Sequence, residues 1–273
     1  MNEVSDTIEC TRALISGWSV PKHNAVVFSE KRSPHALVIP VINEGERIRK
    51  QILRIQKLAL PIDVIIADGG SSDGSLDTEF LSEAGVRSLL TKTDTGRLSA
   101  QLRMAYAWCL QEGYEGIVTI DGNGKDGVEA IADFSARLEE GYDYIQGSRY
   151  MKGGVAENTP WERSIGNRLI HAPLLSLAGR TWLSDTTNGF RAYSTKYLLH
   201  PKVKPFRNVF QNYELLFYLT VRAGQIGLNV DQLPVRRCYP ENEPTPTKIS
   251  GIRGKFDLLS QTIAAALGRY KPR

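Results

Sequence analysis

The chain has 273 residues, of which 41% are hydrophobic and 23% are charged, a composition typical of a globular protein with a sizeable core. Disordered and fibrous classes are thereby excluded. The 34 Lys and Arg residues against 30 Asp and Glu residues give a formal net charge of +4. This mild excess suits phosphate-bearing ligands but is too small to indicate a nucleic-acid partner, and we expect none.

The three cysteines, Cys10, Cys109 and Cys238, form no Cys-x-x-Cys pair, so we expect neither a disulfide framework nor a structural zinc site. The N-terminal segment MNEVSDTIEC is acidic and polar, unlike a signal peptide. No stretch reaches the ~18 apolar residues of a membrane span. We therefore expect a cytoplasmic protein that is soluble or sits at the cytoplasmic face of the membrane.

Residues 1–35 show no sustained period, which predicts an N-terminal extension wrapped on the domain that follows. Beyond them, short apolar runs alternate with segments of helical period. The predicted strands are 36–41, 64–67, 117–120 and 144–147, and the predicted helices are 46–58, 99–111 and 128–138. This alternation is typical of βαβ units, so the predicted fold class is α/β, with a mostly parallel sheet flanked by helices.

Polar residues follow each of these predicted strands. They are Asn43 and Glu44 after the first, Asp68 to Asp73 after the second, Asp121 to Asn123 after the third, and Ser148 and Arg149 after the fourth. Ligands of open α/β sheets bind beyond the carboxyl ends of the strands. The four strand ends therefore predict a single ligand-binding crevice.

Asp68 ends a buried strand and is followed by GGSSDGS, whose glycines let the backbone approach a ligand closely. A carboxylate in this place suits a ribose or a base edge. The alternative is a purely structural turn, and Asp73 is expected to act locally by capping the next helix.

Asp121 and Asn123 place two oxygen-bearing side chains two residues apart, beside Gly122. Oxygen ligands on a short loop suit a hard cation such as Mg²⁺ or Mn²⁺. The alternative is a plain turn, since DGNG is also typical of turns.

Arg149 presents a planar fork of donors that suits a diphosphate, and the alternative is a solvated basic loop. Asp185 is a further acid, directly before TTNGFRAY. Glu214 lies in the apolar stretch NYELLFYL, where an unpaired carboxylate is costly. It is expected either to act in the site or to form a salt bridge with Arg191 or Arg222.

Six segments together resemble the GT-A glycosyltransferases of family 2, and among them the dolichyl- or polyprenyl-phosphate hexose synthases. In chain order they are VIPVINEGERI, IIADGGSSDGS, IDGNGKD, GSRYMKGG, DTTNGFRAY and LPVRRCYP. Each segment alone is a weak signal, but six in the family order are a strong one. The resemblance covers about residues 36–240.

The resemblance implies a GT-A domain over residues 36–245, followed by a C-terminal helical tail over 246–273. It implies metal-assisted transfer of a sugar from a nucleotide-sugar donor, with a polyprenyl phosphate as the first candidate acceptor. A lipid-linked or polysaccharide precursor of a surface glycan is the alternative acceptor. Stabilisation of the leaving nucleoside diphosphate would come from the metal and from arginine.

The resemblance also implies roles for individual residues. The donor-binding set is Pro40, Asn43, Glu44, Asp68, Gly70, Ser71, Lys125 and Arg191. The metal ligands are Asp121 and Asn123, and the catalytic set is Asp121, Arg149, Asp185 and Glu214. Within these sets Arg149 contacts a phosphate, while Asp185, Arg191 and Glu214 line the acceptor side.

Three positions depart from the family pattern. Gly69 replaces the second acid of the Asp-Asp-Gly-Ser segment, and Asn123 replaces the second acid of the Asp-x-Asp segment. Lys125 stands where the family often has Gln, and we hypothesise that it replaces part of the metal's positive charge. These departures also support a rival class, a sugar-nucleotide-binding module without activity.

A nucleotidyltransferase is a second rival, but it would carry a glycine-rich basic loop where this chain has VINEGERI. The C-terminal segment places Phe256, Leu259, Ile263 and Leu267 near one helical face, between flanking basic residues. This pattern suits an interfacial helix near anionic lipid. The alternative is a helix docked on the core or in a dimer interface.

Overall fold

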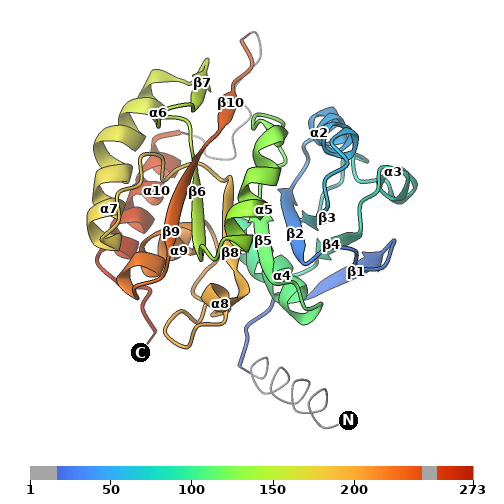
Figure 1. The fold of residues 1–273 in the computed structure, drawn as a ribbon, viewed down its shortest axis with the longest axis horizontal. Coiled ribbons are helices and arrows are strands. Elements are labelled where there is room, and N and C mark those ends of the chain that lie inside the picture. The colour runs from blue at the N-terminus through green and yellow to red at the C-terminus, as the bar shows by residue number, and fades with distance from the viewer. Residues whose placement is uncertain (1–16, 242–250, 273) are drawn as a thin grey trace.

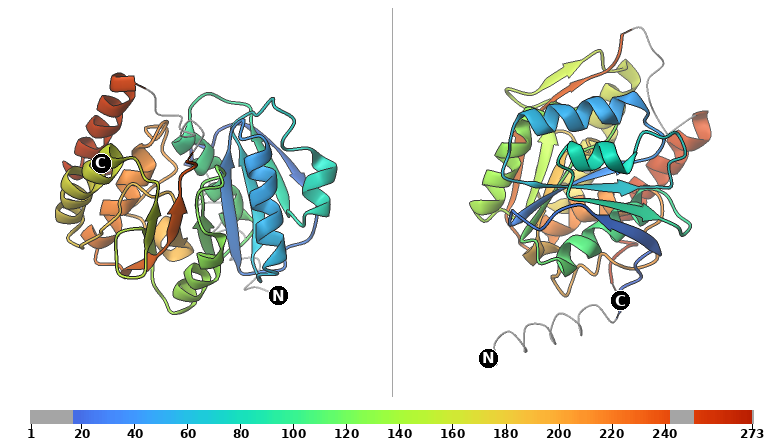
Figure 2. Two further views of the ribbon diagram at one scale, coloured as in Figure 1. Left: turned by 90° about the horizontal axis from the view of Figure 1, so that it is seen from above. Right: turned by 90° about the vertical axis from the view of Figure 1, so that its right-hand side faces the viewer.

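The computed structural model describes residues 17–241 and 251–272. In this part of the chain the main sheet has eight strands, with helices on both of its faces (Figures 1 and 2). In order across the sheet they are β1 (His23–Val27), β4 (Ser88–Lys92), β3 (Asp63–Asp68), β2 (His35–Val41), β5 (Gly116–Thr119), β8 (Arg191–Ser194), β6 (Tyr144–Ser148) and β9 (Val230–Pro234). The pairs among β4, β3, β2 and β5 are parallel, whereas β8 runs antiparallel to β5 and β6.

The predicted α/β fold with a mostly parallel sheet is therefore confirmed. The helices are α2 (Glu46–Lys57), α3 (Thr78–Glu83), α4 (Leu98–Gln111), α5 (Ile131–Glu139), α6 (Trp161–Ile165), α7 (Ala172–Gly179), α8 (Thr195–Leu198), α9 (Glu214–Gln225) and α10 (Gly251–Ala266). Two shorter helical turns are the 3₁₀ turn η1 (Val128–Ala130) and the π-helical turn η2 (Gly166–His171). A two-stranded parallel sheet pairs β7 (Val155–Glu157) with β10 (Arg236–Cys238).

Strand β2 illustrates why the sheet lies between two helical layers. Its residues are almost all buried, and successive side chains point to opposite faces of a strand. Ala36 and Val38 pack in the core that α4 and α9 cover, whereas Leu37 and Ile39 pack in the core that α2, α3 and α5 cover. A strand apolar on both faces is stable only when both faces are covered.

Helices α6, α7 and α10, with η2, form a group beside β6 and β9, on the left in Figure 1. Helix α10 packs on α7 and α9, where Ala265 joins a small apolar cluster with Leu175, Phe217 and Val221. The docked arrangement given above as the alternative for the tail is thus present in its described part. Within the described ranges, no helix is long and apolar enough to cross a membrane.

Four strands of the main sheet, β1, β4, β8 and β9, were not predicted from the sequence. Strand β1 falls inside the predicted extension and pairs antiparallel with β4 at the sheet edge. The α3–β4 unit was not predicted, since both elements are short. Strand β8 was missed because it starts with a buried arginine, Arg191, and so lacks an apolar run. Its insertion between β5 and β6 leaves their carboxyl ends at the same edge of the sheet.

Candidate active site

The loops after β2 and β3 are joined by hydrogen bonds. The backbone N–H of Asn43 donates to Ser71 Oγ (3.0 Å), and that of Ser72 donates to Asn43 Oδ1 (2.8 Å). Asp68 Oδ1 accepts from the N–H groups of Gly70 (3.1 Å) and Ser71 (2.8 Å). The structure therefore brings four of the expected donor-binding residues together, with Asp68 shaping the loop.

The side chain of Gln101 also holds the ends of β2 and β3 together. The Gln101 amide donates to the carbonyl oxygens of Val41 (2.8 Å) and Ala67. A Cβ added at Gly69 would lie 3.3 Å from Ile42 Cβ, a close contact. Gly69, where the family has an acid, therefore sits tightly against the first strand end.

The remaining expected residues of these loops have local partners. Pro40 pairs in register with Ala67 on β3. Glu44 is buried and accepts a hydrogen bond from Arg47 Nη2 (3.3 Å). The expected helix cap at Asp73 is wrong, because Asp77 caps α3 by accepting from the Phe80 N–H (2.9 Å).

Asp73 instead closes a turn onto Ser75, with Oδ1 accepting from its hydroxyl (2.7 Å). Its Oδ2 accepts from the Gly45 N–H (2.8 Å), which adds a further link between the two loops.

Asp121 follows β5 and has a side chain that is 26% exposed. Its Oδ2 accepts from Arg237 Nη2 (2.9 Å) and from Asn123 Nδ2 (3.4 Å), and its carbonyl oxygen accepts from Gln51 Nε2 (3.0 Å). A Cβ at Gly189 would lie only 2.2 Å from Asp121 Oδ1, so the carboxylate fits in this position because residue 189 has no side chain.

Arg237 holds two carboxylates at once. Its Nη1 donates to both oxygens of Asp126 (2.7 and 2.6 Å), which is fully buried, while its Nη2 donates to Asp121. A β-bridge between Asp126 and Arg237 keeps β10 beside the loop after β5. Arg237 lies in the segment LPVRRCYP, but the resemblance implied no role for it.

The charges of this group shift one another's pKa values. Burial opposes ionisation of Asp121, but Arg237 and Lys125 outweigh it and lower the pKa of that carboxyl. Burial prevails at Asp126 and raises its pKa despite Arg237. Burial and repulsion by Arg237 lower the pKa of Lys125 to about 8.

The residues expected as metal ligands do not fit a resident divalent cation in this arrangement. One of the two, Asp121, is engaged by Arg237, and the other, Asn123, is a neutral amide. The Asn123 Oδ1 already accepts from the Lys125 N–H (3.3 Å). Throughout the described ranges, no group of three or more His, Cys, Asp or Glu residues is placed to hold a metal ion.

Four cations surround the buried side chain of Tyr239. Lys125 Nζ lies 4.9 Å from the ring centroid, and the guanidinium carbons of Arg163 and Arg237 lie 5.7 and 5.8 Å from it. Arg149 Nη1 lies 3.4 Å from the hydroxyl. Burial raises the pKa of Tyr239, but these cations outweigh burial and lower it. We call Lys125, Arg149, Arg163 and Arg237 the cationic cluster.

Arg149 and Asp185, both expected in the site, form one buried ion pair. Arg149 Nε and Nη2 donate to the two oxygens of Asp185 (2.6 and 2.9 Å), and the Arg149 N–H donates as well (3.2 Å). Burial alone would lower the pKa of Arg149, but its hydrogen bonds to Asp185 raise it. Asp185 therefore orients Arg149 toward Tyr239.

Glu214 and Arg191 shape the loops around the site. Glu214 Oε2 accepts from the N–H groups of Gln211 (2.9 Å) and Asn212 (2.6 Å). The salt bridge to Arg191 or Arg222 considered above is wrong, because both arginines donate elsewhere. Arg191 donates to carbonyl oxygens at residues 186, 188 and 216, and Arg222 donates to one at residue 202.

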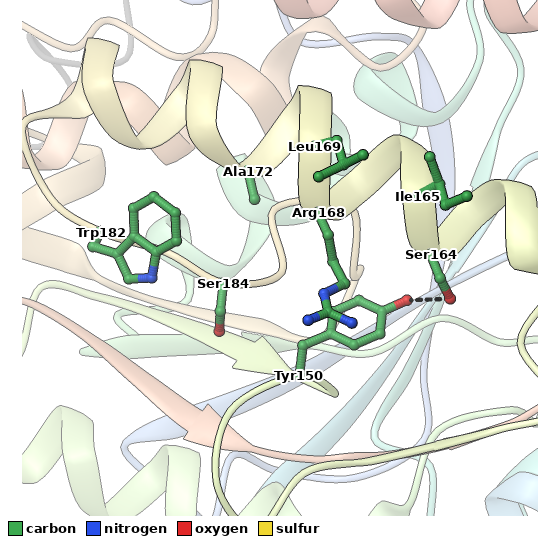
Figure 3. A pocket seen from close by; sticks show the side chains of 8 residues that line it. All are labelled: Tyr150, Ser164, Ile165, Arg168, Leu169, Ala172, Trp182 and Ser184. Atoms are coloured by element: carbon green, nitrogen blue, oxygen red, sulfur yellow. Dashed lines mark hydrogen bonds between the residues drawn. The ribbon is translucent and has the colours of Figure 1, made fainter.

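A pocket of about 480 Å³ opens next to the Arg149–Asp185 pair, lined by Tyr150, Ser164, Ile165, Arg168, Leu169, Ala172, Trp182 and Ser184. Figure 3 shows the helix that carries Ser164, Arg168 and Leu169 along one side of it. The Tyr150 and Ser164 hydroxyls lie 3.1 Å apart, and the Arg168 guanidinium lies 5.8 Å from the Tyr150 ring centroid. Apart from Tyr150 in the segment GSRYMKGG, the lining residues belong to none of the six segments, so no sequence motif indicates this pocket.

Polar residues lie at the ends of parallel strands along one edge of a mixed α/β sheet, where the ligands of such folds bind. Residues 36–200 match the family model "Glycosyl transferase family 2". The chain belongs to this family of glycosyltransferases, which confirms the resemblance described above.

Two curated relatives match most of the chain. Polyprenol monophosphomannose synthase of Mycolicibacterium smegmatis is 27% identical over 218 residues, which cover 79% of this chain and 80% of the relative. Undecaprenyl-phosphate mannosyltransferase of Micrococcus luteus is 26% identical over 220 residues, which cover 78% and 86%.

Among solved structures, glucosyl-3-phosphoglycerate synthase of Mycobacterium tuberculosis shares the fold. Its complex with Mn²⁺, UDP and glucosyl-3-phosphoglycerate superposes with a TM-score of 0.59 at 16% identity, over 96% of this chain and 83% of that one. Its complex with Mn²⁺, UDP-glucose and phosphoglyceric acid gives a TM-score of 0.58 at 18% identity, with the same coverage.

Proposed function

We propose that the protein transfers a hexose from a nucleoside-diphosphate sugar to a polyprenyl phosphate. The main support for a polyprenyl-phosphate acceptor is the pocket beside Arg149, because it combines an apolar wall with basic and hydroxyl groups. The names of both curated relatives support a polyprenyl-phosphate acceptor, and the complexes of the solved structure support a nucleotide-sugar donor.

The donor would bind across the loops after β2, β3 and β5. Asp68 and the Asn43–Ser71 contacts shape the side that suits the nucleoside, while the diphosphate would lie against Asp121 and the cationic cluster. The expected Mg²⁺ or Mn²⁺ would bind in this region, but the expected ligands Asp121 and Asn123 fit a divalent cation poorly. We therefore derive the transfer from the residues alone.

The acceptor phosphate would lie between Arg149 and Arg168, at the polar end of the pocket. Its prenyl chain would leave along Ile165, Leu169 and Trp182, whose side chains are 47%, 71% and 64% exposed. Exposed tryptophan and leucine beside arginines are typical of surfaces that lie in the membrane interface. This face therefore supports a peripheral contact with the membrane that holds the acceptor.

The chemistry needs no strong general base. An oxygen of the anionic acceptor phosphate attacks C1 of the sugar, and the bond between C1 and the β-phosphate oxygen breaks. The electron pair of that bond leaves with the nucleoside diphosphate. Fixed cations next to the departing diphosphate stabilise the charge that develops there. Lys125, Arg163 and Arg237 of the cationic cluster would act on this side, while Arg149, oriented by Asp185, would hold the acceptor phosphate.

The test supplies radiolabelled UDP-glucose, GDP-mannose and UDP-N-acetylglucosamine to the purified full chain, with undecaprenyl phosphate in anionic vesicles. We expect one donor to label the lipid fraction. The Arg168→Gln variant should raise the KM for undecaprenyl phosphate about tenfold, the value of one charge-assisted hydrogen bond, with an unchanged KM for the donor.

A matched control is Arg54→Gln, which removes an exposed arginine on α2, remote in the fold from the pocket. Label transferred only to a water-soluble acceptor, or no label with any donor, would contradict the proposal. The second result would favour the inactive binding module considered above.

A further inference from the structure

The surroundings of Asp121 differ from what a divalent cation requires. The four cations of the cationic cluster lie around Tyr239, and two of them, Arg149 and Arg237, pair with three carboxylates, those of Asp121, Asp126 and Asp185. A dication is attracted by an excess of negative charge. Here the excess is one positive charge, which favours an anion.

Arg237 already engages the carboxylate of Asp121 through Oδ2 (2.9 Å). Its guanidinium is 6% exposed and is fixed from behind by the fully buried Asp126. Releasing Asp121 to a metal would therefore cost an ion pair in a largely buried site, where charge interactions are poorly screened. Neutral Asn123 adds no charge that would compensate.

The cationic cluster is well placed to bind phosphate instead. Its members come from the loop after β5, the end of β6, helix α6 and strand β10, so the fold gathers them around one buried phenol ring. The Tyr239 carbonyl accepts from Asn158 Nδ2 (3.3 Å) and its N–H donates to the carbonyl oxygen of Glu157 (3.1 Å), which fixes the residue in place.

We propose that this chain binds its nucleotide-sugar, and stabilises the departing diphosphate, with the cationic cluster rather than with a divalent cation. In this arrangement Lys125 and Arg163 would contact phosphate oxygens. Arg237 is a positioning residue that holds Asp121 and adds to the local positive field. The inference rests on the proposed function for the identity of the ligand, a nucleoside diphosphate.

Titration calorimetry of the full chain with UDP and with GDP tests the binding step. Each nucleotide is titrated in EDTA and again in excess Mn²⁺. We expect the Kd of the preferred nucleotide to agree within about threefold between the two buffers, a difference well under one tenfold step. Binding that appears only with Mn²⁺, or that tightens more than about thirtyfold with it, would overturn the inference.

Two variants test whether the cationic cluster or a metal ion binds the nucleotide. Asn123→Asp restores a second carboxylate beside Asp121, and we expect it to weaken binding in EDTA and to make binding respond to Mn²⁺. Arg163→Gln should weaken binding in EDTA about tenfold, the value of one charge-assisted hydrogen bond. Neither variant removes the counter-ion of Asp126, so both are expected to fold, which thermal melting checks.

Lys50→Gln, at an exposed position on α2, is the control for loss of one positive charge. If Arg163→Gln and Lys50→Gln bind the nucleotide equally well in EDTA, the role assigned to the cluster is refuted.

The transfer assay distinguishes this inference from the proposed function. A protein that binds UDP or GDP in EDTA but labels no lipid contradicts the proposed function and leaves the inference standing. Lipid labelling that requires Mn²⁺ would contradict the inference and leave the proposed function standing. Absence of nucleotide binding in both buffers would overturn both.

Discussion

At the scale of single residues, most acids expected in the site are held by fixed partners. Asp68 accepts two backbone N–H groups, Asp185 is bound by Arg149, and Glu214 caps the turn before α9. Carboxylates satisfied in this way fix the conformation of the loops and side chains that donate to them. Asp121 differs, because it combines a buried counter-ion with partial exposure to the crevice.

The first prediction concerns Gly189→Ala. The new Cβ would lie 2.2 Å from Asp121 Oδ1, so the carboxylate must turn away from its place beside Arg237. We expect the rate of sugar transfer to fall about 10- to 100-fold, because a displacement of about 1 Å in a preorganised site has effects of that size. The measurement is kcat/KM for the donor. Gly166→Ala, where a Cβ meets nothing within 4 Å, is the control; equal rates for the two variants would contradict the prediction.

At the scale of elements, α10 combines a docked face with an exposed one. Ala265 is buried on α7 and α9, and the Thr262 hydroxyl lies 3.0 Å from His171 Nδ1. On the other side Phe256 and Leu267 are each 66% exposed, and Ile263 is 41% exposed. Docking uses one face of α10 and leaves the apolar side chains of the other face exposed, so a contact with lipid remains a prediction.

The second prediction separates these two faces. Ala265→Leu inserts extra methylene groups into a packed cluster, and we expect a loss of about 1–3 kcal/mol in the free energy of unfolding. Phe256→Ser removes an exposed ring, and we expect a change within about 0.5 kcal/mol but weaker sedimentation with anionic vesicles. Urea unfolding and vesicle sedimentation provide the two measurements. Unchanged vesicle binding of Phe256→Ser would remove α10 from the membrane contact.

At the scale of the whole molecule, two histidines, the buried His35 and the half-buried His171, link separate elements. His35 on β2 lies 2.6 Å from Ser135 Oγ on α5, and His171 joins η2 to α10. Burial lowers the pKa of both below the ordinary value of 6.5. Each histidine therefore binds its proton more readily in the unfolded chain than in the folded one.

The third prediction follows from the sign of that difference. Stability should be nearly constant above about pH 6.5 and should fall as the pH drops below it, because the unfolded state then binds more protons. Thermal melting between about pH 5 and 8 measures the dependence. The melting temperature of His171→Gln should fall less below pH 6.5 than that of the unaltered protein. The melting temperature of His200→Gln, a substitution at a half-exposed position outside these contacts, should fall as much as in the unaltered protein. Identical slopes would contradict the role of His171.

The parts of the fold predicted from sequence are those with a strong local signal. Strands β2 and β3 are apolar runs, and the predicted helices 46–58 and 99–111 match α2 and α4 to within one residue at each end. Strands β1 and β8 gave no such signal, because one is an exposed edge strand and the other begins with Arg191. Their places in the sheet depend on pairing with β4, β5 and β6, contacts between residues far apart in the chain.

The sequence by itself determined the α/β class, the family and the polar residues at the strand ends, because these follow from local periodicity and ordered motifs. Only the tertiary structure decided how the charges are paired. Arg237 lies 116 residues from Asp121 in the chain, and no local pattern predicts that its guanidinium binds Asp121 and Asp126 together. Ion pairs and pockets depend on which distant segments the fold brings side by side, and burial then sets how strongly those charges act.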